Sequence, residues 1–189
     1  ESKAILHTGE DAYRYQADQI MSAIGQSDNQ FTPMQMCVYF STLLNQGVRY
    51  RATFLNRVVS SDYQNTIVQN SPEVMSTMAI SDEALQTCLE GMRAAVTHPA
   101  GTAHGVFGGY PREVGAKTGT AEHASGGSDH GAFICFAAKK GGEPEVAIAI
   151  YGEKVAHGST LAPIAEDILE VYFEKEAASD VFTYENRVG

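Results

Sequence analysis

The sequence predicts an α+β fold, in which an antiparallel β-sheet is flanked by helices on both faces. Residues 113–122, 132–139 and 145–151 have strand-like compositions, and only short segments connect them. Short connections favour antiparallel neighbours, because a parallel return needs a dozen or more residues. Helical patterns lie before and after these strands. Strands accompanied by separate helices in this way are typical of the α+β class.

The first long helix is predicted to begin after Thr32. Threonine is a favoured N-cap residue and Pro33 is tolerated at the first helical position, whereas Gly47 supplies a stop signal. Residues 34–44 are apolar on nearly every side, which indicates a buried helix. The preceding residues are polar and weakly patterned, so we expect mostly loop there, with a short helix around residues 17–23.

The next segment predicts short strands followed by a second helix. Residues 48–60 combine β-branched and aromatic residues and indicate a strand or hairpin, with a second short strand near residues 66–69. Ser81 is a capping residue followed by two acids, so a helix is expected from there to His98. Its apolar residues recur at helical spacing: Leu85, Cys88, Leu89, Met92 and Val96.

The last third contains a glycine-rich segment, the three strands and a final helix. Residues 99–111 include four glycines and predict a mobile loop. The strand at residues 145–151 is apolar on both faces, one formed by Val146, Ile148 and Ile150 and the other by Ala147 and Ala149. We therefore expect it to be covered on both sides. Residues 159–176 predict an amphipathic helix, and residues 177–189 a polar tail.

Charge and composition exclude several functional classes. The 189 residues carry 13 basic and 23 acidic side chains, a net charge of −10. Nucleic-acid binding depends on lysine and arginine neutralising phosphates, so this balance argues against it, and also against attraction to an anionic lipid surface. No apolar run approaches the roughly 20 residues that span a bilayer. The sequence is typical of a globular domain with one core.

The three cysteines predict buried hydrophobic positions rather than reactive thiols. Cys37, Cys88 and Cys135 each have apolar neighbours, and none lies in a C-x-x-C spacing. A zinc ribbon and a dithiol redox site are therefore disfavoured.

The motif with the clearest chemistry is Lys117-Thr118-Gly119-Thr120, on a predicted strand. Lys117 supplies a fixed positive charge, the two threonines supply hydroxyl donors, and Gly119 lets a ligand approach the backbone. Together they suit a peptide carboxylate lying antiparallel to the strand, and the N–H of Thr120 could serve as one oxyanion donor. An exposed edge strand whose lysine deters aggregation is the alternative interpretation.

The order of several motifs resembles the C-terminal half of the transpeptidase domain of class B penicillin-binding proteins, within the serine β-lactamase and penicillin-binding superfamily. The matching segments are Ile24-Gly25-Gln26, Thr32-Pro33-Met34-Gln35, the helix ending Leu44-Asn45-Gln46-Gly47, Gly101-Thr102-Ala103 and Lys117-Thr118-Gly119-Thr120-Ala121. The resemblance implies that residues 1–176 are the C-terminal part of a transpeptidase (penicillin-binding) domain, with residues 177–189 as its tail. It implies a partial transpeptidase-like fold.

The resemblance also implies a function and a site. A serine D,D-transpeptidase of peptidoglycan synthesis transfers the acyl group of a stem peptide, and β-lactams acylate the same serine. Lys117 and Thr120 would take catalytic roles, and Lys117, Thr118, Gly119 and Thr120 would bind substrate. Other cell-wall synthesis proteins are the implied partners, no cofactor or metal is expected, and the parent protein would be anchored in the cell membrane with this part on the extracytoplasmic face.

Two features depart from the family pattern. No serine in the chain is followed by lysine three residues later, so the nucleophile motif is absent and we expect the chain to be an inactive fragment. Ser27-Asp28-Asn29 has the letters of a second family motif. It lies where the family has its I-G-Q-G segment, so we interpret it as a coincidental loop. In a fragment, the apolar helix after Thr32 would lack contacts that the rest of the domain ordinarily supplies. We therefore expect a rearranged N-terminal segment or self-association to cover it.

Two other interpretations are compatible with the same residues. A serine β-lactamase or β-lactam sensor shares the lysine-threonine-glycine strand, and a non-catalytic binding module could retain the same fold. A metal site is disfavoured because the histidines match no zinc spacing. These histidines are His98, His104, His123, His130 and His157. The acidic pairs Asp82-Glu83 and Glu166-Asp167 are adjacent on predicted helices, so their side chains diverge.

Overall fold

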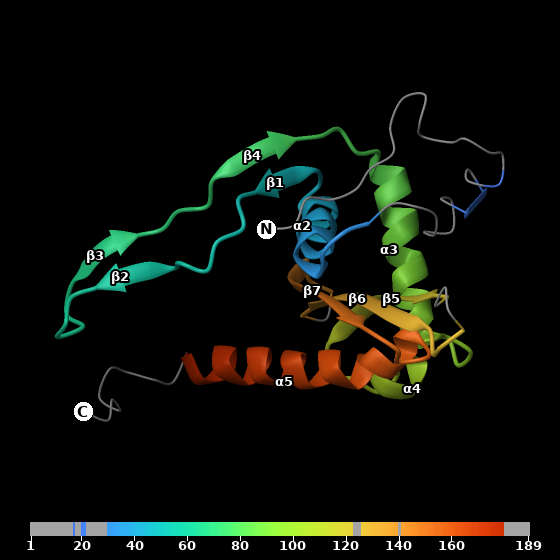
Figure 1. The fold of residues 1–189 in the computed structure, drawn as a ribbon. Helices are drawn as coiled ribbons and strands as arrows, with labels where there is room; N and C mark the ends of the chain where they lie inside the picture. The colour runs from blue at the N-terminus through green and yellow to red at the C-terminus, as the bar shows by residue number, and fades with distance from the viewer. Residues whose placement is uncertain (1–16, 18–19, 22–29, 123–125, 140, 180–189) are drawn as a thin grey trace.

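The computed structural model describes residues 17, 20–21, 30–122, 126–139 and 141–179. Its centre is an antiparallel sheet in the order β5-β6-β7, formed by Glu113–Ala121, His130–Ala138 and Pro144–Gly152 (Figure 1). The predicted ranges, 113–122, 132–139 and 145–151, agree with these three strands to within two residues at each end. The predicted α+β class with an antiparallel sheet is confirmed.

Helices cover both faces of this sheet. On one face, α4 (His104–Phe107), η2 (Gly158–Leu161) and α5 (Ala162–Ser179) pack over Val114, Ala116, Phe133 and Cys135. On the other face, α2 (Pro33–Leu44) and α3 (Asp82–Thr97) pack over Phe136. The strand β7 contributes Ile148 to the first core and Ala147 to the second. The prediction that this strand is covered on both sides is confirmed.

The helix α2 begins and ends where the sequence indicates. The Thr32 hydroxyl accepts a hydrogen bond from the Gln35 N–H, and the Gln35 side chain accepts one from the Thr32 N–H, which completes a capping box. Gly47 follows the helix with a φ of +90°, a backbone conformation that favours glycine. The prediction of burial on nearly every side is wrong, because Met34 and Tyr39 are exposed. Among the described residues, α2 meets β7 on one side and β1 on another, and Phe40 packs with Leu85 and Leu89 of α3.

The helix α3 confirms the second helical prediction. The Ser81 hydroxyl accepts from the Ala84 N–H, and Asp82 and Glu83 occupy the first turn. Leu85, Leu89 and Val96 are buried as their spacing predicts. The cysteine prediction holds for Cys135, but it is wrong for Cys88, which is exposed on this helix. Cys37 is half-buried and donates its S–H to the Ala147 carbonyl at 3.6 Å.

Between α2 and α3 the chain forms a long two-stranded arm that projects from the body (Figure 1). The strands β1 (Val48–Tyr50) and β4 (Val74–Thr77) form one antiparallel pair, and β2 (Arg57–Val59) and β3 (Thr66–Gln69) form the other. The predicted strand at residues 66–69 is confirmed. The hairpin alternative for residues 48–60 is wrong, because β1 and β2 each pair with a later strand, and β4 was not predicted.

Two further differences concern the loops and the last helix. The predicted loop at residues 99–111 contains the short helix α4. The predicted helix at residues 159–176 is the 3₁₀ turn η2 followed by α5, which runs to Ser179. Of the predicted helix around residues 17–23, only residues 17, 20 and 21 are described, and they are helical. Within the described residues, no helix is both long enough and apolar enough to span a membrane.

Candidate functional site

The strand β5 carries Lys117-Thr118-Gly119-Thr120 along an edge of the sheet. Within the described residues β5 pairs with β6 alone, so among them its other edge has no strand partner and could accept an added strand. Side chains alternate along a strand. Lys117 and its partner Ile134 therefore share the face of α2 and α3, whereas Thr118 and Thr120 share the opposite face with the buried Ala116.

The Lys117 side chain is exposed, and its ammonium group donates to the Thr118 carbonyl. The charged group thus lies beside the backbone of its own strand. Gly119 is half-buried and has the same orientation as Lys117, with the nearest side-chain contact for an added Cβ, Ala132 Cβ, at 3.4 Å. On this face of β5, the exposed Lys117 side chain is therefore followed by Gly119, where no side chain covers the backbone.

A threonine that sequence reasoning did not assign to the site lies on the other face. The Thr118 and Thr102 hydroxyl oxygens are 3.2 Å apart and hydrogen-bonded. Thr102 is held by a tight turn at the end of α3, where the Gly101 N–H donates to the His98 carbonyl and the Ala103 N–H donates to the Ala95 carbonyl. The Gly101-Thr102-Ala103 sequence carried the signal, but its contact with Thr118 depends on the tertiary fold.

Thr120 has a neighbour from the segment after β7. The Gly158 N–H points at the Thr120 hydroxyl oxygen at 3.5 Å, where η2 begins. An accepted N–H leaves the threonine hydroxyl free to donate its own hydrogen. The site is therefore formed by β5, the turn after α3 and the start of η2.

The histidines that the structure describes do not come together as a metal site. His104 Nδ1 is 2.8 Å from the Val96 carbonyl, His98 Nδ1 accepts from the Ala100 N–H, and the His130 ring stacks on Tyr151. Among the described residues, no group of three or more histidine, cysteine, aspartate or glutamate side chains could hold a metal. His123 and Ser27-Asp28-Asn29 lie outside the described residues.

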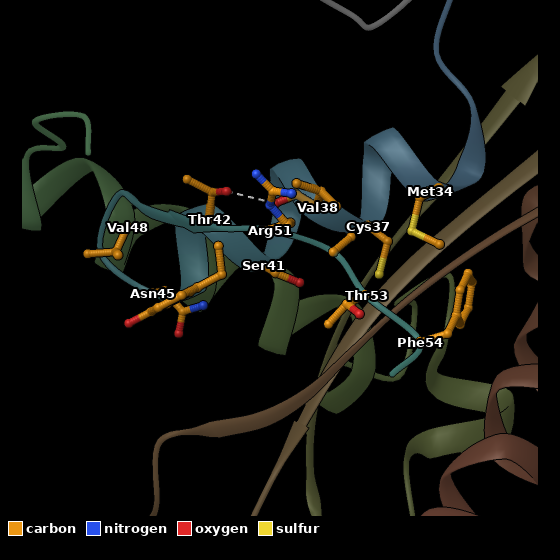
Figure 2. Close-up of a pocket in the computed structure, with 12 residues that line it drawn as sticks. Met34, Cys37, Val38, Ser41, Thr42, Asn45, Val48, Arg51, Thr53 and Phe54 are labelled. Carbon is orange, nitrogen blue, oxygen red and sulfur yellow. Dashed lines mark hydrogen bonds between the residues drawn. The ribbon is translucent and has the colours of Figure 1, made fainter. Parts of the chain in front are cut away.

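A separate cavity of about 580 Å³ lies between α2 and the base of the arm (Figure 2). Its lining includes one thiol and several hydroxyl groups, together with Arg51 from the arm; these are Cys37, Ser41, Thr42, Tyr50 and Thr53. The Thr42 hydroxyl is already bonded to the Val38 carbonyl at 2.7 Å. The lining contains no histidine, lysine or carboxylate that could activate Cys37 or Ser41. The cavity also lacks all four residues of the lysine-threonine-glycine-threonine motif, so we do not assign the catalytic site to it.

Residues 4–170 match the family described as penicillin binding protein transpeptidase domain. The chain belongs to this family. The resemblance to class B penicillin-binding proteins is thereby confirmed. The chain is 32% identical over 155 residues to the peptidoglycan D,D-transpeptidase PbpA of Mycolicibacterium smegmatis. The aligned region covers 76% of this chain and 30% of that protein. It is 28% identical over 170 residues to MrdA of Escherichia coli, covering 82% of this chain and 26% of that protein.

Solved structures show the same fold. Penicillin-binding protein A from M. tuberculosis, an imipenem acyl-enzyme complex, superimposes with a TM-score of 0.68 at 26% identity and covers 85% of this chain and 35% of that chain. Penicillin-binding protein 2B from Streptococcus pneumoniae R6 gives a TM-score of 0.72 at 22% identity, covering 100% and 30%. The chain therefore spans about a third of the length of the proteins that it matches.

Proposed function

We propose that the protein containing this chain is a serine D,D-transpeptidase of peptidoglycan synthesis, and that β5 forms one wall of its active site. The observation that carries the proposal is the position of Lys117-Thr118-Gly119-Thr120 on an exposed sheet edge in a chain that belongs to the penicillin-binding transpeptidase family. Two relatives, PbpA of Mycolicibacterium smegmatis and MrdA of Escherichia coli, are peptidoglycan D,D-transpeptidases by name and support it.

The reaction is covalent acyl transfer in two steps. A serine hydroxyl attacks the penultimate D-Ala carbonyl, an ester forms, and the terminal D-Ala leaves with a proton on its amine. An amine of a neighbouring stem peptide then attacks the ester, an amide forms, and the serine recovers its proton. Replacing one difficult displacement by two easier ones is the advantage of a covalent intermediate.

The residues of β5 act on the anionic end of the substrate and on the developing oxyanion. A stem peptide lying along the open edge of β5 would have Lys117 on one side and the hydroxyls of Thr118 and Thr120 on the other. Lys117 supplies positive potential to the substrate carboxylate and assists proton transfer, and the hydroxyls donate to the carboxylate. The Thr120 N–H is the proposed oxyanion donor; loss of one such donor typically costs about 10²–10³ in rate.

The same wall would accept β-lactams. Penicillin-binding protein A from M. tuberculosis is described as an imipenem acyl-enzyme complex, and it is 26% identical to this chain. We therefore propose that β-lactams acylate the same serine in the protein containing this chain.

A structure of PBP2 with MreC from Helicobacter pylori shares the fold. Other cell-wall synthesis proteins are accordingly the proposed partners, at the extracytoplasmic face of the cell membrane.

The nucleophile must come from outside these 189 residues, since no serine here has a lysine three positions later. A fluorescent penicillin should label the full-length protein in stoichiometric amounts and should not label the isolated chain. Stoichiometric labelling of the isolated chain would contradict the assignment. Rapid release of hydrolysed β-lactam by the full-length protein would favour a β-lactamase instead, and absence of any labelling would favour a non-catalytic binding module.

A further inference from the structure

Three glycines meet behind the lysine-threonine-glycine-threonine segment. An added Cβ at Gly158 would lie 2.3 Å from the Gly119 carbonyl oxygen, 2.9 Å from the Gly119 nitrogen and 2.3 Å from the Ala132 carbonyl oxygen. An added Cβ at Gly131 would lie 3.0 Å from the Gly158 Cα. The start of η2 thus rests directly on the backbone of β5 and β6, where even a methyl group does not fit. The atoms in the way are backbone atoms, which cannot turn aside as a flexible side chain can.

The contact lies on the face that carries Thr118 and Thr120. Gly119 directs its own side-chain position to the opposite face, so its peptide is bare on this one. Gly158 lies against this bare peptide, and its N–H points at the Thr120 hydroxyl. The φ of Gly158 is not in the left-handed region, so the restriction at this position is the lack of space rather than the backbone conformation.

The segment around Gly158 is fixed at both ends and cannot retreat easily. Val155 packs on the core and fills the space above Gly131 and Gly152, and Leu161, three residues after Gly158, is buried in the same core. The Thr160 hydroxyl bonds the carbonyls of Val155 and His157 at 3.2 and 2.6 Å, which closes the turn on itself. By contrast, β5 is hydrogen-bonded to one neighbour within the described sheet, whereas β6 is held on both sides.

We propose that Gly158 is a positioning residue for the transpeptidase site: the turn from Val155 to Leu161 supports β5 from behind and sets where the Gly119 and Thr120 backbone lies. The inference rests on the proposed function, in which the Thr120 N–H and hydroxyl contact the substrate. A side chain at Gly158 would push against a fixed turn on one side and an edge strand on the other. The edge strand moves, and the oxyanion donor moves with it.

The test is the second-order rate constant for acylation of the full-length protein by a fluorescent penicillin. Gly158→Ala should lower this rate constant at least 10-fold, while Gly91→Ala, the same change at an exposed helical glycine with open space around it, should leave it within 2-fold. In a Thr120→Val background, Gly158→Ala should still lower the rate constant clearly, because this variant keeps the Thr120 N–H that the displaced strand carries. An unchanged rate in Gly158→Ala, or a fall no larger than the unfolded fraction measured by circular dichroism at the assay temperature, would overturn the proposal.

A second pair of variants avoids added bulk altogether. Thr160→Val removes the exposed hydroxyl that closes the turn, and Thr160→Ser retains it. The rate constant should fall several-fold in the first and recover in the second; equal rates in both would count against the turn as a support.

The failure of the proposed function gives a different result. If the wild-type protein is not acylated at all, the proposed function is wrong. The positioning role of the turn is then tested by NMR, from the backbone amide resonances of Gly119 and Thr120. Shifts in Gly158→Ala and Thr160→Val, but not in Gly91→Ala or Thr160→Ser, would uphold the positioning role. Unmoved resonances would refute it.

Discussion

Gly115 on β5 and Phe136 on β6 lie directly opposite each other, and the ring of Phe136 covers the glycine. An added Cβ at Gly115 would be 2.3 Å from Phe136 Cε1 and 3.2 Å from Met92 Cβ on α3. The ring is fully buried, and the Arg93 guanidinium lies 5.3 Å from its centroid. This contact joins β5 to the second core and fixes the strand immediately before Lys117.

Removing this ring should strongly destabilise the chain. Phe136→Ala is expected to cost about 3–5 kcal/mol, because a large buried side chain leaves a cavity. Gly115→Ala should cost about 1–3 kcal/mol by overpacking. The two costs should not add, since the cavity left by the ring accommodates the new methyl group. Urea unfolding of the two single variants and of the double variant measures this. Gly109→Ala, at a glycine with open space around it, is the control. Strictly additive costs would show that the contact is not tight.

The capping box of α2 predicts a smaller and local effect. Thr32→Ala removes the acceptor for the Gln35 N–H and should lower the free energy of unfolding by about 1 kcal/mol. Thr66→Ala, at an exposed position on β3, should change it by less than about 0.5 kcal/mol. Circular dichroism during urea unfolding gives both values. Equal costs at the two positions would mean that the cap contributes nothing specific.

Much of the helix and sheet arrangement was predictable because its signals are local. Thr32 and Ser81 are capping residues whose side chains bond within three residues, and short connections forced the three long strands to run antiparallel. The strand β4 was missed because its partner β1 is more than twenty residues away. Cys88 follows the helical spacing of its neighbours, yet its exposure depends on how far α3 reaches over the sheet.

The site was only partly predictable for the same reason. Lys117, Thr118 and Thr120 carry their chemistry in their side chains, so their motif could be read from the sequence. Thr102 and Gly158 meet this motif only through contacts with residues 16 or more positions away. A glycine that is required for close backbone packing looks like any other glycine in a sequence. Only the distances to Gly119 distinguish Gly158.

The cysteines should differ sharply in reactivity. Burial raises the pKa of the Cys135 thiol to about 12, from a usual value of 9.0, so it stays protonated in the native protein at neutral pH. An Ellman reagent should modify the exposed Cys88 rapidly and Cys135 only after unfolding. Cys88→Ser should abolish the fast phase and leave the rest unchanged. A fast phase that persists in this variant would contradict the assignment.

The same shift gives a pH dependence with a definite sign. Because the folded-state pKa of Cys135 lies above the unfolded-state pKa, the unfolded chain loses this proton first as the pH rises. Stability from this group is complete below about pH 9 and is lost progressively towards pH 12. Cys135→Ala should flatten this part of the stability profile between pH 9 and 11. An unchanged slope in the variant would show that other groups cause the loss.

Lys117 offers the most direct test of the wall formed by β5. In the full-length protein, Lys117→Ala should lower the rate of acylation by a fluorescent penicillin by on the order of 100-fold, because it removes an exposed positive charge from the strand edge at which we propose that the substrate carboxylate binds. Lys139→Ala removes an equally charged side chain whose ammonium lies 3.7 Å from Glu145, beyond the far end of the paired strands, and should leave the rate within 2-fold. Raising the salt concentration should slow the wild-type protein and the Lys139 variant alike, and should affect the Lys117 variant less, since screening acts on a charge that this variant lacks. Equal rates for the two lysine variants would remove Lys117 from the site.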